Sequence, residues 1–370
     1  MELSAEDALR LNVLLANGPL AIRINESSMR VHGLLPNGEA AIDLKPTTSD
    51  EKYLKVVRAM LSEHALGSPG GYPLYLQRWT RMGRMRDESL HALLKLGDPT
   101  AVFAVVCAEG LTDELARRAW WAAEEPENAR RMLQTKAVAK GNTGKKLARY
   151  LIEYLPFEVE PEKMIESVAM ALQPGLLPED IRFALWKKAG RKLPYLVGFI
   201  VANPDDLPDQ LEAREDQGRF KPVLDELAAA GNPAAVVMDR VLSGSGQTLL
   251  ATCLKILERP SSQEVVTRTF EVMRGYLGPL RNEDPDLSLD ELENQAAEYC
   301  SRSATALELL HLAPSLGDEL QTLYLLSGLG YGVIRPVLGG STATGSLMRR
   351  KLEPVIGRLL IRINILLGRR

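Results

Sequence analysis

Residues 86–133 constrain the fold more than any other stretch, because their sequence specifies the turns between consecutive short helices. A leucine-rich helical stripe ends at Gly97. Asp98 and Pro99 then cap and open the next helix, since proline is favoured in a first turn, where its missing N–H costs nothing. A further helix start follows at Thr112. The pattern predicts short helices packed against one another across tight turns.

The same turn sequence returns at 231–233, where LAAAGNPAAVVMDRVL echoes LLKLGDPTAVFAVVCA in residue class. The string L-G-D-P-x-A-V followed by D-E-L-A-R-R-A resembles a HEAT-like repeat, an α-solenoid unit that buries its apolar face only against a neighbour. Glycine followed by Asp or Asn and then Pro is also a common turn between helices. We predict a mainly α fold, a HEAT-like α-solenoid or helical-repeat array with a small N-terminal β-meander.

The meander is predicted at 21–44, after a first helix at 4–17 that Ser4 caps with Asp7 at the reciprocal position. Apolar and polar residues alternate there, and Pro36-Asn37-Gly38 marks a turn. Such a small sheet must pack on a helix to be stable. The glycine-rich loop at 67–73 contains two prolines and no following Gly-Lys-Ser/Thr, so we expect a helix connection there and not a phosphate site.

Charge divides the chain unevenly, although the net charge is only −3. Counting Lys, Arg, Asp and Glu, residues 1–63 carry −2, 64–204 carry +4, 205–346 carry −11 and 347–370 carry +6. We predict four regions: 1–46, a helix and the meander; 47–204, a basic HEAT-like region; 205–340, an acidic helical region; and 341–370, a flexible joint and a basic helix. The acidic stretch 204–216 is interpreted as a linker or exposed loop, and a second acidic segment becomes a helix at Ser288.

The composition is that of an ordinary globular protein, with 45% hydrophobic and 25% charged residues. Three widely separated cysteines indicate a reducing compartment, and Cys107 is expected to be a small buried hydrophobe on an apolar helical face. The N-terminus does not resemble a signal peptide. The longest uncharged stretch, between Glu319 and Arg335, is too short to span a membrane. We therefore expect a cytoplasmic protein.

The sequence contains no catalytic motif that we recognise. The four histidines lie far from one another and from any cysteine in a ligand spacing, so the usual zinc sites are not expected. Walker, G-x-S-x-G and dinucleotide-binding patterns are also missing. We expect no cofactor, no metal and no enzymatic activity.

Basic clusters are the strongest functional signal. No acid occurs between Glu127 and Glu153, where seven Lys or Arg residues fall, and arginines surround Trp79 in another acid-free stretch. Basic faces of this kind bind phosphate backbones or acidic proteins. Runs of charged residues are also common on ordinary solvated helix faces. The candidate partner-binding residues are Arg78, Trp79, Arg81, Arg84, Arg117, Arg118, Trp121, Lys136, Lys140, Lys145, Lys146, Lys351, Arg358, Arg362 and Arg369. Of the adjacent Trp120 and Trp121, one should be core and the other should lie at a repeat interface or on an exposed patch.

The C-terminal segment 347–370 is predicted to be an amphipathic helix after a Gly-Ser-Thr joint. Lys351, Arg358, Arg362 and Arg369 form one basic stripe beside an apolar arc. We favour a helix that packs this arc on the end of the helical array, with the stripe facing the acidic region. The alternative is a detachable arm that binds an anionic membrane surface, RNA or an acidic partner.

Several segments together resemble the DsrS family, soluble accessory proteins encoded with the dissimilatory sulphite reductase genes of sulphur-oxidising bacteria. These segments are INESSMRVHGL, LGSPGGYPLYLQRWTRMGRMRDESL, GLTDELARRAWW, ENARRML and the PDDLP stretch. The resemblance implies a non-enzymatic regulatory scaffold of sulphur oxidation (the dsr system) that binds a protein or RNA partner. It supplies no catalytic residues. The alternative is a cysteine-dependent sulphur-transfer protein or another enzyme of sulphur metabolism, although the chain lacks the C-terminal cysteine pair of a sulphur carrier.

Overall fold

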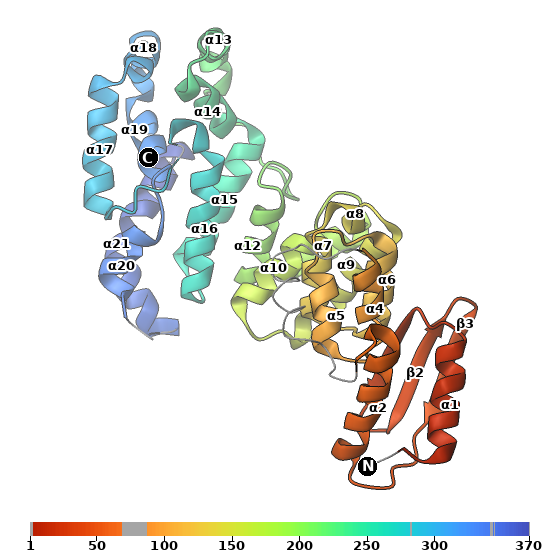
Figure 1. Ribbon diagram of the computed structural model, residues 1–370. Coiled ribbons are helices and arrows are strands. Elements are labelled where there is room, and N and C mark those ends of the chain that lie inside the picture. Colours follow the sequence, from red (N-terminus) through yellow and green to blue (C-terminus); the bar gives the residue numbers. More distant parts are fainter. Residues whose placement is uncertain (1–2, 69–86, 282, 341–342, 344, 370) are drawn as a thin grey trace. The chain divides into compact units, whose positions relative to one another are not determined.

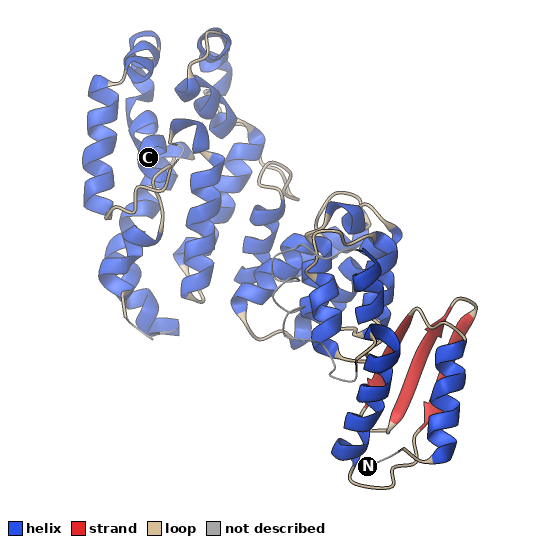
Figure 2. Ribbon diagram, in the orientation of Figure 1, coloured by secondary structure: helices blue, strands red, loops and turns tan. Residues whose placement is uncertain are grey.

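The computed structural model describes residues 3–68, 87–281, 283–340, 343 and 345–369. In these residues the chain is mainly helical, and its β-structure is a single three-stranded antiparallel sheet near the N-terminus (Figure 2). The chain forms two compact units, residues 1–156 with 173–177, and residues 157–172 with 178–370. We describe each unit separately.

The first unit begins with an α-β-β-β-α module (Figure 1). Its elements are α1 (Ala5–Ala16), β1 (Ala21–Asn25), β2 (Arg30–Leu35), β3 (Gly38–Asp43) and α2 (Asp50–Leu66). The strands pair in the order β1-β2-β3, and Leu35 pairs with Gly38 across a two-residue turn. The predicted meander is therefore confirmed. Apolar side chains of both helices and of the sheet form one core, which includes Leu11, Val31 and Val57.

Asp7 has a different role from the one that the sequence predicts. The Ser4 hydroxyl caps α1 by accepting from the Asp7 N–H at 3.1 Å. The Asp7 carboxylate, which is fully buried, accepts from the Tyr53 hydroxyl at 2.5 Å and from the Lys45 N–H at 2.9 Å. Both hydrogen bonds end on Oδ2, so this oxygen joins α1 to α2 through Tyr53 and to the segment after β3 through Lys45.

After residue 86, short helices make up most of the first unit. They are α4 (Asp87–Leu93), α5 (Pro99–Val106), α6 (Asp113–Ala122), α7 (Pro126–Leu133), α8 (Lys136–Ala139) and α9 (Asn142–Tyr154), followed by a 3₁₀ turn, η1 (Leu155–Phe157). The predicted caps are present. Asp98 accepts from the Thr100 N–H at 2.9 Å, and Thr112 accepts from the Leu115 N–H at 3.2 Å. Gly97 has a φ of +61°, a conformation that glycine adopts without strain.

In the described residues of the second unit, the regular secondary structure is helical, and irregular segments connect the helices. Its helices are α10 (Pro161–Ala171), α11 (Glu179–Ala189), α12 (Leu193–Ala202), α13 (Gln217–Ala229), α14 (Pro233–Leu242), α15 (Gly244–Glu258), α16 (Gln263–Tyr276), η2 (Gly278–Leu280), α17 (Leu289–Arg302), α18 (Ala304–Leu312), η3 (Pro314–Leu316), α19 (Gly317–Leu326), α20 (Tyr331–Leu338) and α21 (Gly345–Leu366). Contacts here join helices distant in sequence, such as α10 with α16 and α15 with α21. A solenoid of nearest-neighbour contacts is therefore not established.

The echoed turn has the same geometry as its counterpart. Gly231 has a φ of +88°, Asn232 accepts from the Ala234 N–H at 3.0 Å, and Pro233 is the first residue of α14. Asn232 also donates to the Thr305 carbonyl at 2.9 Å, a contact that attaches the start of α14 to α18. The two turns are thus equivalent locally, as the sequence predicts.

The acidic stretch 204–216 lies in an irregular segment, but side-chain contacts hold it to the helices of its unit. Asp209 accepts from the Trp186 indole N–H at 2.9 Å, and the Leu211 N–H donates to the Thr248 hydroxyl at 2.9 Å. Leu207 is buried. The segment is therefore a fixed connection within the second unit.

Candidate functional site

The candidate residues divide into four groups in the structure. Arg78, Trp79, Arg81 and Arg84, together with most of the loop 67–73, lie outside the described residues. Arg117, Arg118 and Trp121 lie on α6, and four lysines lie on α8, at its end and on α9. The last group lies on and after α21, in the other unit.

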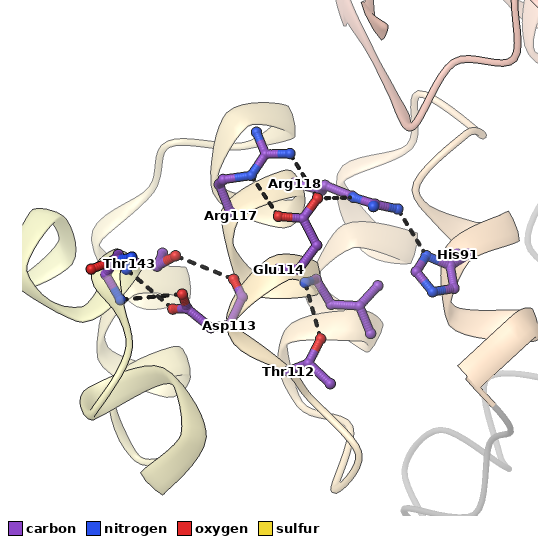
Figure 3. A network of polar contacts seen from close by, with 9 residues as sticks. His91, Thr112, Asp113, Glu114, Arg117, Arg118 and Thr143 are labelled. Carbon is purple, nitrogen blue, oxygen red and sulfur yellow. Dashed lines mark hydrogen bonds and ion pairs between the residues drawn. The ribbon is translucent and has the colours of Figure 1, made fainter. Parts of the chain in front are cut away.

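Arg117 and Arg118 are held by Glu114, one turn earlier on the same helix (Figure 3). Nε of Arg117 and Nε of Arg118 donate to the carboxylate at 2.7 and 2.8 Å. Arg118 also reaches Nδ1 of His91 on α4 at 3.1 Å, and its side chain is only 16% exposed. The hydrogen bond from Arg117, aided by the one from Arg118, lowers the pKa of Glu114 from 4.5 to about 2. These two guanidinium groups therefore stabilise α6 and its contact with α4.

Trp121 packs against the β-sheet, a contact that the sequence does not reveal. The Arg23 guanidinium lies 4.7 Å from the centre of its ring, and the indole N–H donates to Glu39 at 2.7 Å. Trp120 is 2% exposed and belongs to the core, as expected for one of the two tryptophans. The partly exposed Trp121 thus joins α6 to β1 and β3, and we do not assign it to partner binding.

An acidic side chain of α6 caps the N-terminus of α9 (Figure 3). The Asp113 carboxylate accepts from the Asn142 N–H at 3.2 Å and from the Thr143 N–H at 3.1 Å. A Cβ on Gly141 would stand 2.2 Å from Oδ1 of Asp113, so a larger residue would force this carboxylate to shift. The carboxylate occupies the place where an external anion would meet these N–H groups.

Four predicted lysines form an exposed basic surface at α8 and α9. Lys136 and Lys140 lie four residues apart, as do Lys145 and Arg149, so each pair shares a helix face. The two helices approach each other closely at Gly144. A Cβ on this glycine would stand 2.6 Å from the Val138 carbonyl oxygen. We call this set the α8–α9 surface; it consists of Lys136, Lys140, Lys145, Lys146 and Arg149, all exposed.

The cations of the α8–α9 surface make almost no ion pairs with the described residues. Lys146 lies 3.9 Å from Glu124, the outer limit of an ion pair. The other four have no ion-pair partner among the described residues. Arg149 belongs to the same basic stretch but is missing from the candidate residues, and its spacing from Lys145 would have identified it.

The basic stripe of α21 is partly paired with α17. Arg358 lies 2.7 Å from Asp290 and also pairs with Glu293, and these contacts raise its pKa. Arg362 lies 3.9 Å from Glu293. Lys351 and Arg369 are exposed. The apolar arc is turned inward, since Leu352, Ile356, Leu359 and Ile363 are buried. A membrane-binding arm would need this apolar arc to be exposed. The structure instead has the helix packed on its own unit with the arc buried.

The cysteines lack the features of a reactive thiol. Cys107 is exposed at the end of α5 and not buried as predicted, because the helix stops there and turns it outward. Partial burial nevertheless raises the pKa of Cys107 and of Cys300, and full burial raises that of Cys253 to about 12. A nucleophilic cysteine needs the opposite shift.

The described part of the chain shows neither a candidate metal site nor a candidate membrane span. No group of three His, Cys, Asp or Glu side chains there is placed to hold a metal ion. No described helix has both the length and the apolar character required to cross a membrane.

Comparison with known proteins gives no relative for this chain. No protein-family model matches it, and neither does any curated protein or solved structure. The resemblance to the DsrS family therefore rests on the sequence segments quoted above.

Proposed function

We propose that this chain is a non-enzymatic accessory protein of dissimilatory sulphur oxidation that binds an acidic protein or RNA partner. The α8–α9 surface is the observation that carries the proposal. Its five exposed cations lie on neighbouring elements, and among the described residues only Lys146 has an acid, Glu124, within ion-pair distance. Cations left in water without counter-charges attract anionic partners and speed their association.

The scaffold in this proposal is a HEAT-like helical-repeat array. Two observations support it: the matching geometry at Gly97 and Gly231, and the Asp or Asn cap followed by Pro in both turns. The place in sulphur oxidation is supported by the sequence segments that resemble the DsrS family. Sulphur transfer through a cysteine is the weaker alternative, since the pKa of every cysteine is raised.

The test compares two matched double variants of the full chain. Lys145→Gln/Lys146→Gln removes two cations of the α8–α9 surface, whereas Lys52→Gln/Lys55→Gln removes two exposed lysines of α2. We expect earlier elution from heparin and weaker RNA retention for the first variant only. On single-stranded RNA, the log–log salt slope should fall by about 0.7 for each phosphate that the variant does not bind. Identical elution of both variants would contradict the role of this surface.

A second experiment tests the biological assignment. Affinity purification of the full chain from sulphur-grown cells should recover proteins or transcripts of the dsr system. The Lys145→Gln/Lys146→Gln variant should recover less of them. Recovery of neither class by the wild-type chain would contradict the proposal.

A further inference from the structure

A second basic surface, in the other unit, combines cations with an exposed aromatic ring. Phe183 on α11 is 42% exposed, and the Lys187 ammonium lies 4.5 Å from the centre of its ring. Phe183 and Lys187 are one helical turn apart and share a face. We call this set the α11 surface; it consists of Phe183, Lys187, Lys188, Arg191, Lys192 and Lys255.

The cations of this surface gather at the C-terminal end of α11. Lys187 and Lys188 lie in its last turn, and Arg191 and Lys192 follow directly. Lys255 comes from α15, and its Nζ lies 3.7 Å from the point where a Cβ on Gly190 would stand. All five are exposed, and none has an ion-pair partner in the described ranges. The partial negative charge of the helix end offsets only part of this charge.

The acids nearest in sequence are engaged elsewhere or lie at the margin of the surface. Glu179 and Asp206 pair with Arg182, and Asp209 accepts from Trp186. Asp180 lies one turn before Phe183, at the start of α11, and Glu258 lies three residues after Lys255. The α11 surface therefore carries five cations and two marginal acids, and Lys187 lies directly against the Phe183 ring.

We propose that the α11 surface binds single-stranded RNA, with a base stacked on Phe183 and the flanking phosphates on the cations. This inference rests on the proposed function and specifies its partner. Single strands combine phosphates with unstacked bases, and surfaces that bind them pair cations with aromatic rings. A duplex offers the same phosphates, but its bases are already stacked on one another. An acidic protein would use the cations and gain little from an exposed phenyl ring.

The experiment measures the affinity of the full chain for a fluorescein-labelled twelve-nucleotide oligouridylate by anisotropy. Phe183→Ala should weaken binding about fivefold, near the lower end of the range for one base stacked on an aromatic side chain. Phe183→Trp should bind the oligonucleotide as the wild type does, because an indole ring also stacks on a base. Phe103→Ala is the control, because Phe103 is an aromatic residue of similar exposure, 39%, on α5. Unchanged melting temperatures establish that the variants are folded.

Lysine variants and competitors complete the test. Lys187→Gln/Lys188→Gln should reduce the salt slope by about 0.7 for each phosphate that these lysines neutralise, whereas Lys52→Gln/Lys55→Gln should leave it unchanged. Duplex RNA of equal length should bind Phe183→Ala and wild type equally. Unchanged oligouridylate affinity in Phe183→Ala, or competition by polyglutamate as strong as by RNA, would overturn the inference.

The proposed function and this inference fail separately. If Lys145→Gln/Lys146→Gln weakens binding and the α11 variants do not, the α8–α9 surface stands and the inference is rejected. The reverse result supports the α11 surface and rejects the role of α8–α9. A wild-type chain that does not bind the oligonucleotide overturns the inference and leaves only an acidic protein for the α8–α9 surface.

Discussion

Nη1 of Arg214 lies 3.1 Å from Oε1 of Glu319, and the two side chains are only 7% and 4% exposed. Arg214 belongs to the irregular acidic segment, and Glu319 to α19. The same guanidinium also binds Asp216 at 2.6 Å. The carbonyl oxygen of Ile365, near the end of α21, lies 3.5 Å from its Nη1. One buried arginine thus connects three parts of the second unit that are far apart in sequence.

We predict that Arg214→Met destabilises the fold by about 3–5 kcal/mol, because it removes the cation that faces a buried carboxylate. Equilibrium urea unfolding measures this change. Arg302→Met is the control, since its pair with Glu298 is exposed and should contribute at most about 1 kcal/mol. Adding Glu319→Leu to Arg214→Met should recover part of the loss. Equal losses for Arg214→Met and Arg302→Met would contradict the prediction.

Glu114 should give the first unit an acid-sensitive contribution. Its pKa is lowered from 4.5 to about 2, so the carboxylate stabilises the fold above pH 4.5, and this stabilisation is lost as the pH falls toward 2. Because the side chain is 48% exposed, we expect less than about 1 kcal/mol. Urea unfolding of wild type and Glu114→Gln at pH 7 and pH 3 tests this. The stability difference between wild type and Glu114→Gln should be smaller at pH 3 than at pH 7. In an Arg117→Gln/Arg118→Gln background, this difference should change less with pH.

The C-terminal helix should be required for stability. Leu359 is fully buried and Ile361 on the same helix is 65% exposed. Leu359→Ala should cost about 2–5 kcal/mol, whereas Ile361→Ala should stay within about 0.5 kcal/mol. Deletion of 344–370 should lower the melting temperature and increase aggregation. An unchanged melting temperature after this deletion would instead indicate a detachable arm.

Thiol reactivity should follow burial. With a pKa near 12, Cys253 should react with a thiol reagent at pH 8 only after unfolding. Exposed Cys107 should react in the folded chain, but more slowly than a free thiol, because its pKa is raised. Mass spectrometry of the labelled chain identifies each site. A Cys107 that reacts faster than a free thiol would favour the enzymatic alternative.

Two glycine-to-alanine substitutions should have opposite effects. A Cβ on Gly141 would collide with Asp113, so Gly141→Ala should destabilise by about 1–3 kcal/mol. A Cβ on Gly357, inside α21, would meet no atom within 4 Å. Gly357→Ala should therefore stabilise the fold by about 0.5–1 kcal/mol. Thermal unfolding of the two variants measures both, and a shift of the same sign in both would contradict the contact at Gly141.

The sequence by itself determined the local structure of this protein. The turns at Gly97 and Gly231, the cap at Thr112, the hairpin before Gly38 and the helix start at Ser288 all appear as predicted. Each depends on backbone geometry and hydrogen bonds within about four residues, and side-chain type fixes these directly. The pairing of Glu114 with Arg117 and Arg118 is equally local, and its spacing of three and four residues is typical of such pairs.

Only the tertiary structure decided which polar and aromatic groups were satisfied internally and which were left to solvent. Trp121 meets Arg23 across 98 positions, Arg214 meets Glu319 across 105, and Asp7 meets Tyr53 across 46. A periodic pattern gives the face of a helix, but the element that covers that face lies far along the chain. The lysines of α8 and α9 stay exposed for the same reason. Among the described residues, the Glu124 carboxylate is the one acid within ion-pair distance of these lysines, 3.9 Å from Lys146.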